Sequence, residues 1–69
     1  MGRVDPRKLE TFRVVAQTRK ISAAAKLLHL SQPAVTAQVR ALEEECGQAL
    51  LLRSSRGVTP TDWGLRLLE

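Results

Sequence analysis

The chain has 69 residues, enough for one small domain with a single hydrophobic core and too few for a second core. Hydrophobic residues make up 43% of the sequence and aromatic residues only 3%, which suits a helical core of Leu, Val and Ala. The shortage of aromatic side chains argues against binding single-stranded nucleic acids by base stacking. The 11 Lys and Arg residues outnumber the 7 Asp and Glu residues, and the net charge of +4 favours a polyanionic partner.

The charges are segregated along the chain, and their distribution is more informative than their total. No acidic residue lies between Glu10 and Glu43, a stretch that contains several Lys and Arg residues. A second acid-free stretch, 46–61, contains Arg53 and Arg56. Such segregation indicates a surface that binds nucleic acid.

Several function classes are excluded by the residues that the sequence lacks. The single histidine, His29, and the single cysteine, Cys46, cannot form a nucleophilic or metal-binding group, so we expect no catalytic residue, metal or cofactor. One cysteine cannot form an internal disulfide, and no apolar run is long enough to span a membrane. The N-terminus lacks the apolar core of a signal peptide. We therefore expect a cytoplasmic protein that is neither an enzyme nor a membrane protein.

The first predicted helix follows a flexible N-terminus at residues 1–5. Asp5 is a favoured N-cap residue, and Pro6 suits the first helical position because no hydrogen bond is lost there. Leu9, Phe12 and Val15 recur at helical spacing and indicate one buried side. The helix should end near residue 18, where a polar run interrupts the pattern.

A short helix, a three-residue turn and a longer helix are predicted next. Ser22 is expected to cap a helix over 23–28, and Ser31 is expected to cap the third helix. Gly47 should end the third helix. The third helix presents to the core the apolar residues Val35, Val39, Leu42 and Cys46. Two helices joined by a tight turn, behind a supporting first helix, are typical of a helix-turn-helix.

The segment after the third helix predicts a β-hairpin. Residues 50–52 and 58–59 form two short apolar strands around a polar turn, and Pro60 should end the second strand. Thr61 is expected to cap a last helix that carries Trp63 and several leucines. The predicted fold is therefore mainly α with a small β-hairpin, a winged helix-turn-helix.

The third helix, residues 31–45, has small and polar residues first and three glutamates last. Small side chains let a helix enter a major groove, and Ala or the Thr methyl can contact a thymine methyl. Gln32 can pair with an adenine edge, and Thr36 can bond to a base or a phosphate. Phosphates would repel the glutamates at residues 43–45, so the acidic end should lie outside the duplex. The order of residues thus predicts a helix that enters DNA by its N-terminal turns.

A series of motifs between residues 22 and 64 then resembles a known family. The motifs are S-A-A-A-K-L-L-H-L-S-Q-P-A-V-T-A-Q-V-R-A-L-E-E-E, G-x-x-L, R-S-S-R-G and T-x-x-G. Over about residues 6–69 the chain resembles the N-terminal winged helix-turn-helix of bacterial LysR-type transcriptional regulators. The resemblance implies binding to interrupted inverted repeats in promoters, as a homodimer or a higher oligomer. It also implies a small-molecule effector, bound by a C-terminal domain that is missing from this sequence.

The candidate site residues fall into four sets, and the resemblance places the recognition helix in the major groove and the wing, 53–57, in the minor groove. The recognition helix contributes Ser31, Gln32, Pro33, Ala34, Thr36, Ala37 and Arg40. Phosphate contacts beside the second helix are expected from Arg19, Lys20 and Ser22. The wing contributes Arg53, Ser55 and Arg56. Residues 6–60 form the DNA-binding domain and 61–69 start a linker helix, with dimerisation through Trp63, Leu65 and Leu68.

Some alternatives stay open at this point. Ala37 stands where many family members carry a long polar side chain, which shifts base recognition toward Gln32, Thr36 and methyl contacts. Arg53 can face either the core or the DNA, because strand residues alternate between faces, and Trp63 can anchor its helix to this domain or to a partner. A winged helix can also serve as a protein–protein interaction module, although a long acid-free surface has no use there.

Overall fold

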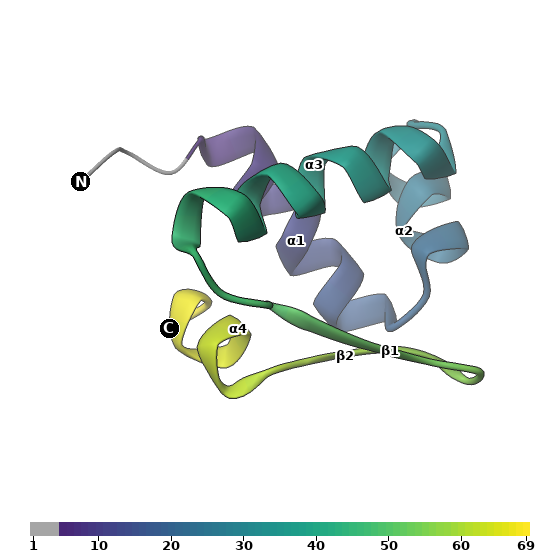
Figure 1. The fold of residues 1–69 in the computed structure, drawn as a ribbon. Helices are drawn as coiled ribbons and strands as arrows, with labels where there is room; N and C mark the ends of the chain where they lie inside the picture. Colours follow the sequence, from purple (N-terminus) through teal and green to yellow (C-terminus); the bar gives the residue numbers. More distant parts are fainter. Residues whose placement is uncertain (1–4) are drawn as a thin grey trace.

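The computed structural model describes residues 5–69, which form helices around a single antiparallel hairpin (Figure 1). The elements in chain order are α1 (Pro6–Thr18), α2 (Ile21–Leu28), α3 (Gln32–Cys46), β1 (Leu51–Ser54), β2 (Gly57–Pro60) and α4 (Asp62–Leu67). The register of the hairpin pairs Leu51 with Pro60 and Arg53 with Val58. The predicted winged helix-turn-helix is confirmed, with α2 and α3 as the helix-turn-helix and the hairpin as the wing.

Three helices begin at the N-cap residues that the sequence predicts. The side chains of Asp5 and Ser31 accept backbone N–H bonds from two and three residues ahead, at 2.9 and 3.2 Å. Thr61 does the same at the start of α4, at 3.1 Å. Asp5 is therefore part of a helix cap rather than of a flexible segment. The other residues of that predicted segment, 1–4, lie outside the described part of the chain.

The second helix begins earlier than predicted, and Ser22 is not its cap. Lys20 occupies the N-cap position without a side-chain hydrogen bond, and Ser22 lies exposed in the first turn. The Lys20 carbonyl accepts the first helical bond, from the Ala24 amide at 3.0 Å. Ile21 packs partly buried against the core, and burying this side chain draws it into the helix. Packing here overrides the local preference of serine for a cap.

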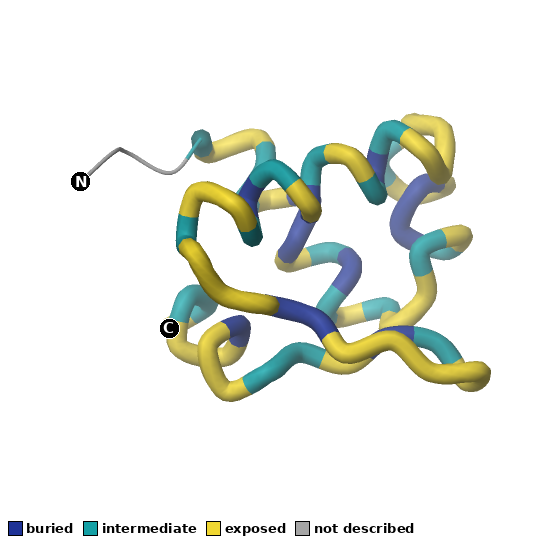
Figure 2. Tube along the Cα trace, viewed as in Figure 1, coloured by how far each residue is buried: buried dark blue, intermediate teal, exposed yellow. Residues whose placement is uncertain are grey.

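The core lies where α1, α2 and α3 meet, and the hairpin closes it. Figure 2 shows the buried segments of these helices turned toward one another. The largest fully buried side chains are Phe12, Leu42, Leu50, Val15, Val35 and Val39. Buried Ala24 and Ala25 let α2 approach its neighbours closely. Cys46 is only half buried and packs at the edge of this core. A buried polar contact, from the Thr11 hydroxyl to the Gln38 amide oxygen, joins α1 to α3.

The hairpin is joined to the end of α1 by a backbone contact. Arg19 ends α1 with a positive φ of 62°, and its carbonyl oxygen accepts a hydrogen bond from the Val58 amide at 2.9 Å. Gly57, with φ of 130°, lies against the same carbonyl, where an added Cβ atom would overlap the oxygen. Glycine is thus required at this position both by its conformation and by the close approach. The contact sets the wing beside the start of α2.

The glutamates at the end of α3 bind other parts of the domain. The Glu43 carboxylate accepts hydrogen bonds from the amides of Leu50 and Leu51, at 2.8 and 3.2 Å, and so holds the start of β1. Glu45 forms an ion pair with Lys8 of α1 at 2.8 Å. The hydrogen bond to Glu45 raises the pKa of Lys8 above its ordinary value. The acidic end of α3 therefore has a structural function that the sequence pattern did not reveal.

The last helix is attached to the hairpin through Thr61. Its hydroxyl donates to the Ala49 carbonyl at 2.7 Å, and its amide donates to the Leu50 carbonyl at 3.0 Å. Gly64 is buried one turn later, directly against the Leu50 carbonyl and 2.9 Å from the Phe12 ring at the position of an added Cβ. The absence of a side chain at Gly64 lets α4 reach the core.

We predict that Gly64→Ala destabilises the domain by about 1–3 kcal/mol, because a new methyl group would be forced against a backbone carbonyl and a buried ring. Gly47→Ala is the comparison, because no atom lies within 4 Å of a Cβ added at Gly47, and only its positive φ of 68° opposes a side chain. That substitution should cost only the conformational penalty, about 1 kcal/mol. Urea unfolding followed by circular dichroism measures both changes. A Gly64→Ala protein as stable as the unmodified chain would contradict the close approach of α4.

We also predict that Glu43→Ala destabilises the domain by about 1–3 kcal/mol, because two backbone amides at the start of β1 would lose their acceptor. Glu44→Ala is the matched control. Glu44 is exposed, and no hydrogen bond or ion pair of its side chain occurs among residues 5–69. The control should change the unfolding free energy by less than about 0.5 kcal/mol. Equal effects of the two substitutions would mean that Glu43 acts only as surface charge.

Candidate nucleic-acid interface

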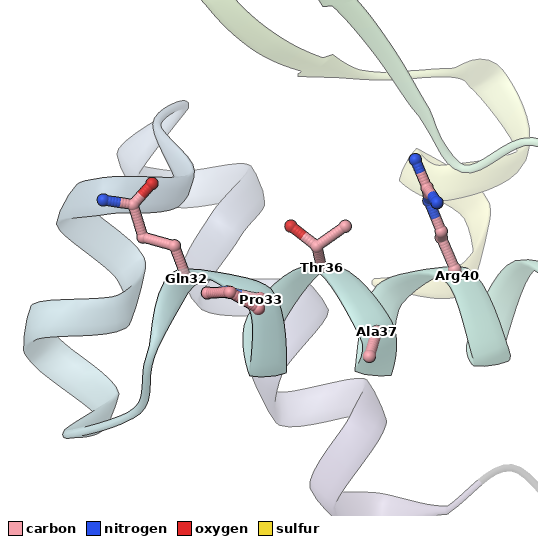
Figure 3. Close-up of a pocket in the computed structure, with 5 residues that line it drawn as sticks. All are labelled: Gln32, Pro33, Thr36, Ala37 and Arg40. Atoms are coloured by element: carbon pink, nitrogen blue, oxygen red, sulfur yellow. The ribbon is translucent and has the colours of Figure 1, made fainter.

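The exposed side of α3 carries two rows of residues, each with members one helical turn apart. Gln32, Thr36 and Arg40 form a polar row, and Pro33 and Ala37 form an apolar row beside it (Figure 3). Together they line one shallow concavity. Residues four apart lie above one another on a helix, so both rows follow the helix axis. Hydrogen-bonding groups thus lie next to a smooth apolar strip.

Two other residues predicted on the recognition helix lie outside this concavity. Ser31 is exposed, but its hydroxyl oxygen accepts the Ala34 amide and caps the helix. Ala34 is half buried. Thr36 is half buried as well, although it lines the concavity with the exposed Gln32 and Arg40. The concavity therefore contains fewer residues than the set predicted for the recognition helix.

A second concavity lies between the wing and the starts of α2 and α3. The predicted residues that line it, from three separate elements, are Lys20, Ser22, Gln32, Arg53, Ser55 and Arg56. Gln32 belongs to both concavities, so they form one continuous surface. Within the described residues, no Asp or Glu lines either concavity. This surface concentrates positive charge, a neutral amide and hydroxyl groups on one side of the domain.

Arg53 does not face the core, one of the two directions that the sequence left open. Its register partner Val58 is buried, and paired residues share one face of a hairpin. Arg53 nevertheless stays exposed and lines the second concavity. Arg53 therefore faces the groove between the wing and α2, on the side of the predicted interface.

Arg19 has a role that the sequence did not indicate. Its side chain is exposed but lies outside the lining of both concavities, whereas its carbonyl holds the wing. Ser54, which was not among the predicted residues, orders the turn of the wing. Its hydroxyl accepts the Arg56 amide at 3.2 Å and donates to the Gly57 carbonyl at 3.4 Å. A serine two residues before the arginine was the available signal, since such hydroxyls commonly bind nearby backbone groups.

Of the three residues predicted for dimerisation, two are exposed and one packs against the core of its own domain. Trp63 and Leu65 are 53% and 52% exposed on α4. Leu68 is half buried and packs against the core of its own domain. The Arg66 guanidinium lies 5.8 Å from the centre of the Trp63 ring, so the indole contacts a cation rather than the core. Only the first two side chains are free to meet a partner.

Residues 5–69 contain no group of three or more side chains suited to binding a metal ion. Within the same residues, every helix is too short or too polar to cross a membrane.

The comparisons with known proteins agree with this geometry. A family model described as the bacterial regulatory helix-turn-helix protein, lysR family, matches residues 6–65. The chain belongs to the LysR family. The match runs from the start of α1 into α4 and includes both concavities, so the surface described above lies within the family domain.

Individual relatives of this LysR-family chain are transcriptional regulators. The regulator AbaB of Streptomyces antibioticus is 54% identical over 56 residues, which cover 81% of this chain and 19% of AbaB. The nitrogen assimilation regulatory protein nac of Escherichia coli (strain K12) is 47% identical over 58 residues, which cover 84% of this chain and 19% of nac. The LysR-family chain thus spans about a fifth of the length of these curated relatives.

A solved structure of a related domain bound to DNA has the same fold. The structure of the CbnR_DBD–DNA complex superimposes with a TM-score of 0.86 at 47% sequence identity. The alignment covers 90% of the LysR-family chain and 71% of the CbnR_DBD chain.

Proposed function

We propose that this chain is the DNA-binding part of a bacterial transcriptional regulator and that it reads a specific duplex sequence. The observation that carries the proposal is the acid-free surface on which the polar row of α3 meets the cations of the wing and of α2. Gln32, shared by both concavities, connects the part suited to bases with the part suited to phosphates. Phosphate contacts position a protein on DNA, while contacts to base edges give specificity.

In this proposal α3 lies in the major groove, which is wide enough for a helix. Gln32 pairs with an adenine edge, Thr36 bonds to a base or phosphate, and the Ala37 methyl contacts a thymine. Because Ala34 is half buried and lines neither concavity, we assign it no more than a packing role. Pro33 completes the apolar strip, and Ser31 brings the N-terminus of α3, with its partial positive charge, toward the duplex.

The backbone contacts come from the second concavity. Lys20 and Ser22 lie at the start of α2, and we assign them to phosphates. Arg53, Ser55 and Arg56 of the wing follow the duplex into the adjacent minor groove, where arginine is favoured by the negative potential. Arg19 is exposed beside them and adds positive charge at longer range.

The alternative, a protein–protein interaction module, gains no support from this surface. The centre of a protein–protein interface is depleted of charged residues. Here Lys20, Arg53 and Arg56 line the second concavity, and Arg40 lines the first. The similarity to a domain solved with DNA supports the nucleic-acid reading. We further propose that the protein is not an enzyme and acts in the cytoplasm, where bacterial promoters are found.

We also propose that the protein acts as a homodimer, with higher oligomers of the whole regulator, on interrupted inverted repeats. Residues 61–69 then start the linker helix, and exposed Trp63 and Leu65 contribute to its seam. The greater length of the curated relatives is consistent with a further domain that binds a small-molecule effector. A two-fold symmetric dimer matches the symmetry of an inverted repeat.

The test is binding to a labelled duplex with an inverted repeat and to a scrambled duplex of equal length, over a salt series. If Lys20, Arg53, Arg56 and Arg19 neutralise phosphates, the affinity of one protomer for a half-site should fall about 100-fold between about 50 and 200 mM salt. The affinity of a dimer for the whole repeat should fall about 10,000-fold, because the number of phosphate contacts doubles. Preference for the repeat should persist over the series. Weak binding to both duplexes at low salt would contradict the proposal and favour the interaction module.

We predict that Gln32→Ala relaxes the base preference at one position of each half-site, because the amide that pairs with adenine is removed. The loss of discrimination should be about 1–3 kcal/mol. Gln17→Ala, at an exposed position of α1, is the control and should leave binding unchanged. Competition with duplexes substituted one base pair at a time gives the measurement. Equal weakening on all duplexes would mean that Gln32 only positions the helix.

A further inference from the structure

Arg40 occupies a distinctive position at the end of the polar row on α3. It is exposed, and it lines the same concavity as Gln32 and Thr36 (Figure 3). In the figure the three side chains rise from the same side of the helix. Gln32 and Arg40 are eight residues apart, which corresponds to about 12 Å along the helix axis. Arg40 therefore extends the readable face of α3 by a full turn beyond Thr36.

The guanidinium of Arg40 has no partner within the described part of the protein, although glutamates lie nearby. Glu43 is already engaged with the amides of Leu50 and Leu51. Glu44, one turn ahead, is exposed and forms no ion pair with Arg40. A cation placed before an acid at this spacing is also the less favourable order on a helix. The donors of Arg40 are thus available to an external acceptor.

The neighbours of Arg40 on the exposed side are short. Pro33 and Ala37 form the apolar row of the concavity, and neither can hold the helix away from the floor of a groove. Because these side chains are short, α3 can approach the floor of the major groove closely, which brings its third turn toward the base edges. The side chain of Arg40 is the longest in the concavity and can span the remaining gap.

We propose that Arg40 reads a guanine in each half-site, through two hydrogen bonds from its guanidinium to N7 and O6 of the base. This inference rests on the proposed function of α3 in the major groove. Guanine is the base whose major-groove edge presents two adjacent acceptors to the fork of an arginine. A helix in the major groove follows the groove rather than the DNA axis, and residues about three apart contact successive base pairs. The eight-residue separation therefore places this guanine about two or three base pairs from the pair that Gln32 contacts.

The test combines a change in the protein with a change of one atom in the DNA. The 69-residue chain first selects its preferred sequences from a randomised duplex library, and the selected duplex is then made with 7-deazaguanine, which lacks the N7 acceptor. Affinities are compared for the unmodified chain, Arg40→Gln and Arg40→Lys. Arg7→Gln removes the same charge from an exposed position on α1 and is the control. Thermal unfolding checks that each variant is folded.

The expected result is a selected guanine about two or three base pairs from the adenine read by Gln32. Replacing this guanine by 7-deazaguanine should lower the affinity of the unmodified chain and of Arg7→Gln for the duplex about 5- to 150-fold. Arg40→Gln should bind both duplexes equally. Arg40→Lys should recover affinity through its charge but little of the discrimination, because it lacks the planar fork.

Three results would overturn the inference. Selection of a clear half-site without guanine at that distance would refute it and leave the proposed function standing. Equal weakening of Arg40→Gln on all sequences, fully restored by lysine, would make Arg40 a phosphate contact. Selection of no preferred sequence at all would refute sequence reading by α3, and the role of Arg40 with it.

Discussion

The carbonyl group of Arg19 accepts a hydrogen bond from the Val58 amide, and this contact joins the wing to the helices. It depends on the left-handed conformation at Arg19, which turns the carbonyl outward at the end of α1, and on Gly57, which lets the hairpin approach. With the wing held in this place, Arg53 and Arg56 share a groove with Lys20 and Ser22. The charged half of the interface therefore exists because two backbone segments, almost forty residues apart, lie in contact.

Glu43 supplies the second support of the same hairpin, at its other end. The carboxylate accepts hydrogen bonds from the amides of Leu50 and Leu51, which joins the end of α3 to the start of the wing. The order of charges along α3 now has two explanations that reinforce each other. In the proposed complex, carboxylates at the far end of the helix avoid the phosphates, and at that same end Glu43 and Glu45 bind the protein itself. A single sequence feature serves both electrostatics and folding.

The small size of the domain explains why such contacts are placed at its edges. A core of this size has few fully buried side chains, and α4 adds to it only because Gly64 allows close packing against Leu50 and Phe12. Trp63 and Leu65 remain outside that packing, on the exposed side of the same helix. Exposed apolar side chains are not confined to α4, because Leu27 of α2 and Leu52 of β1 are exposed as well.

The sequence alone determined those features of this protein that depend on interactions between residues close together in the chain. The caps at Asp5, Ser31 and Thr61, the apolar spacing of α1 and α3, and the Gly and Pro residues that end elements act over a few residues. The fold and the residues of the α3 concavity followed from these patterns, and the family followed from the resemblance of the motifs between residues 22 and 64.

Contacts between distant segments decided what the sequence could not. Burial of Ile21 started α2 ahead of Ser22. The position of the wing beside α2 placed Arg53 in the groove, and folding brought Glu43 to the amides of Leu50 and Leu51. Leu68 packed into its own core instead of remaining free for a partner. Each of these outcomes depends on which surfaces meet after the chain folds, and hydrophobic burial and close packing select those surfaces without a local signature.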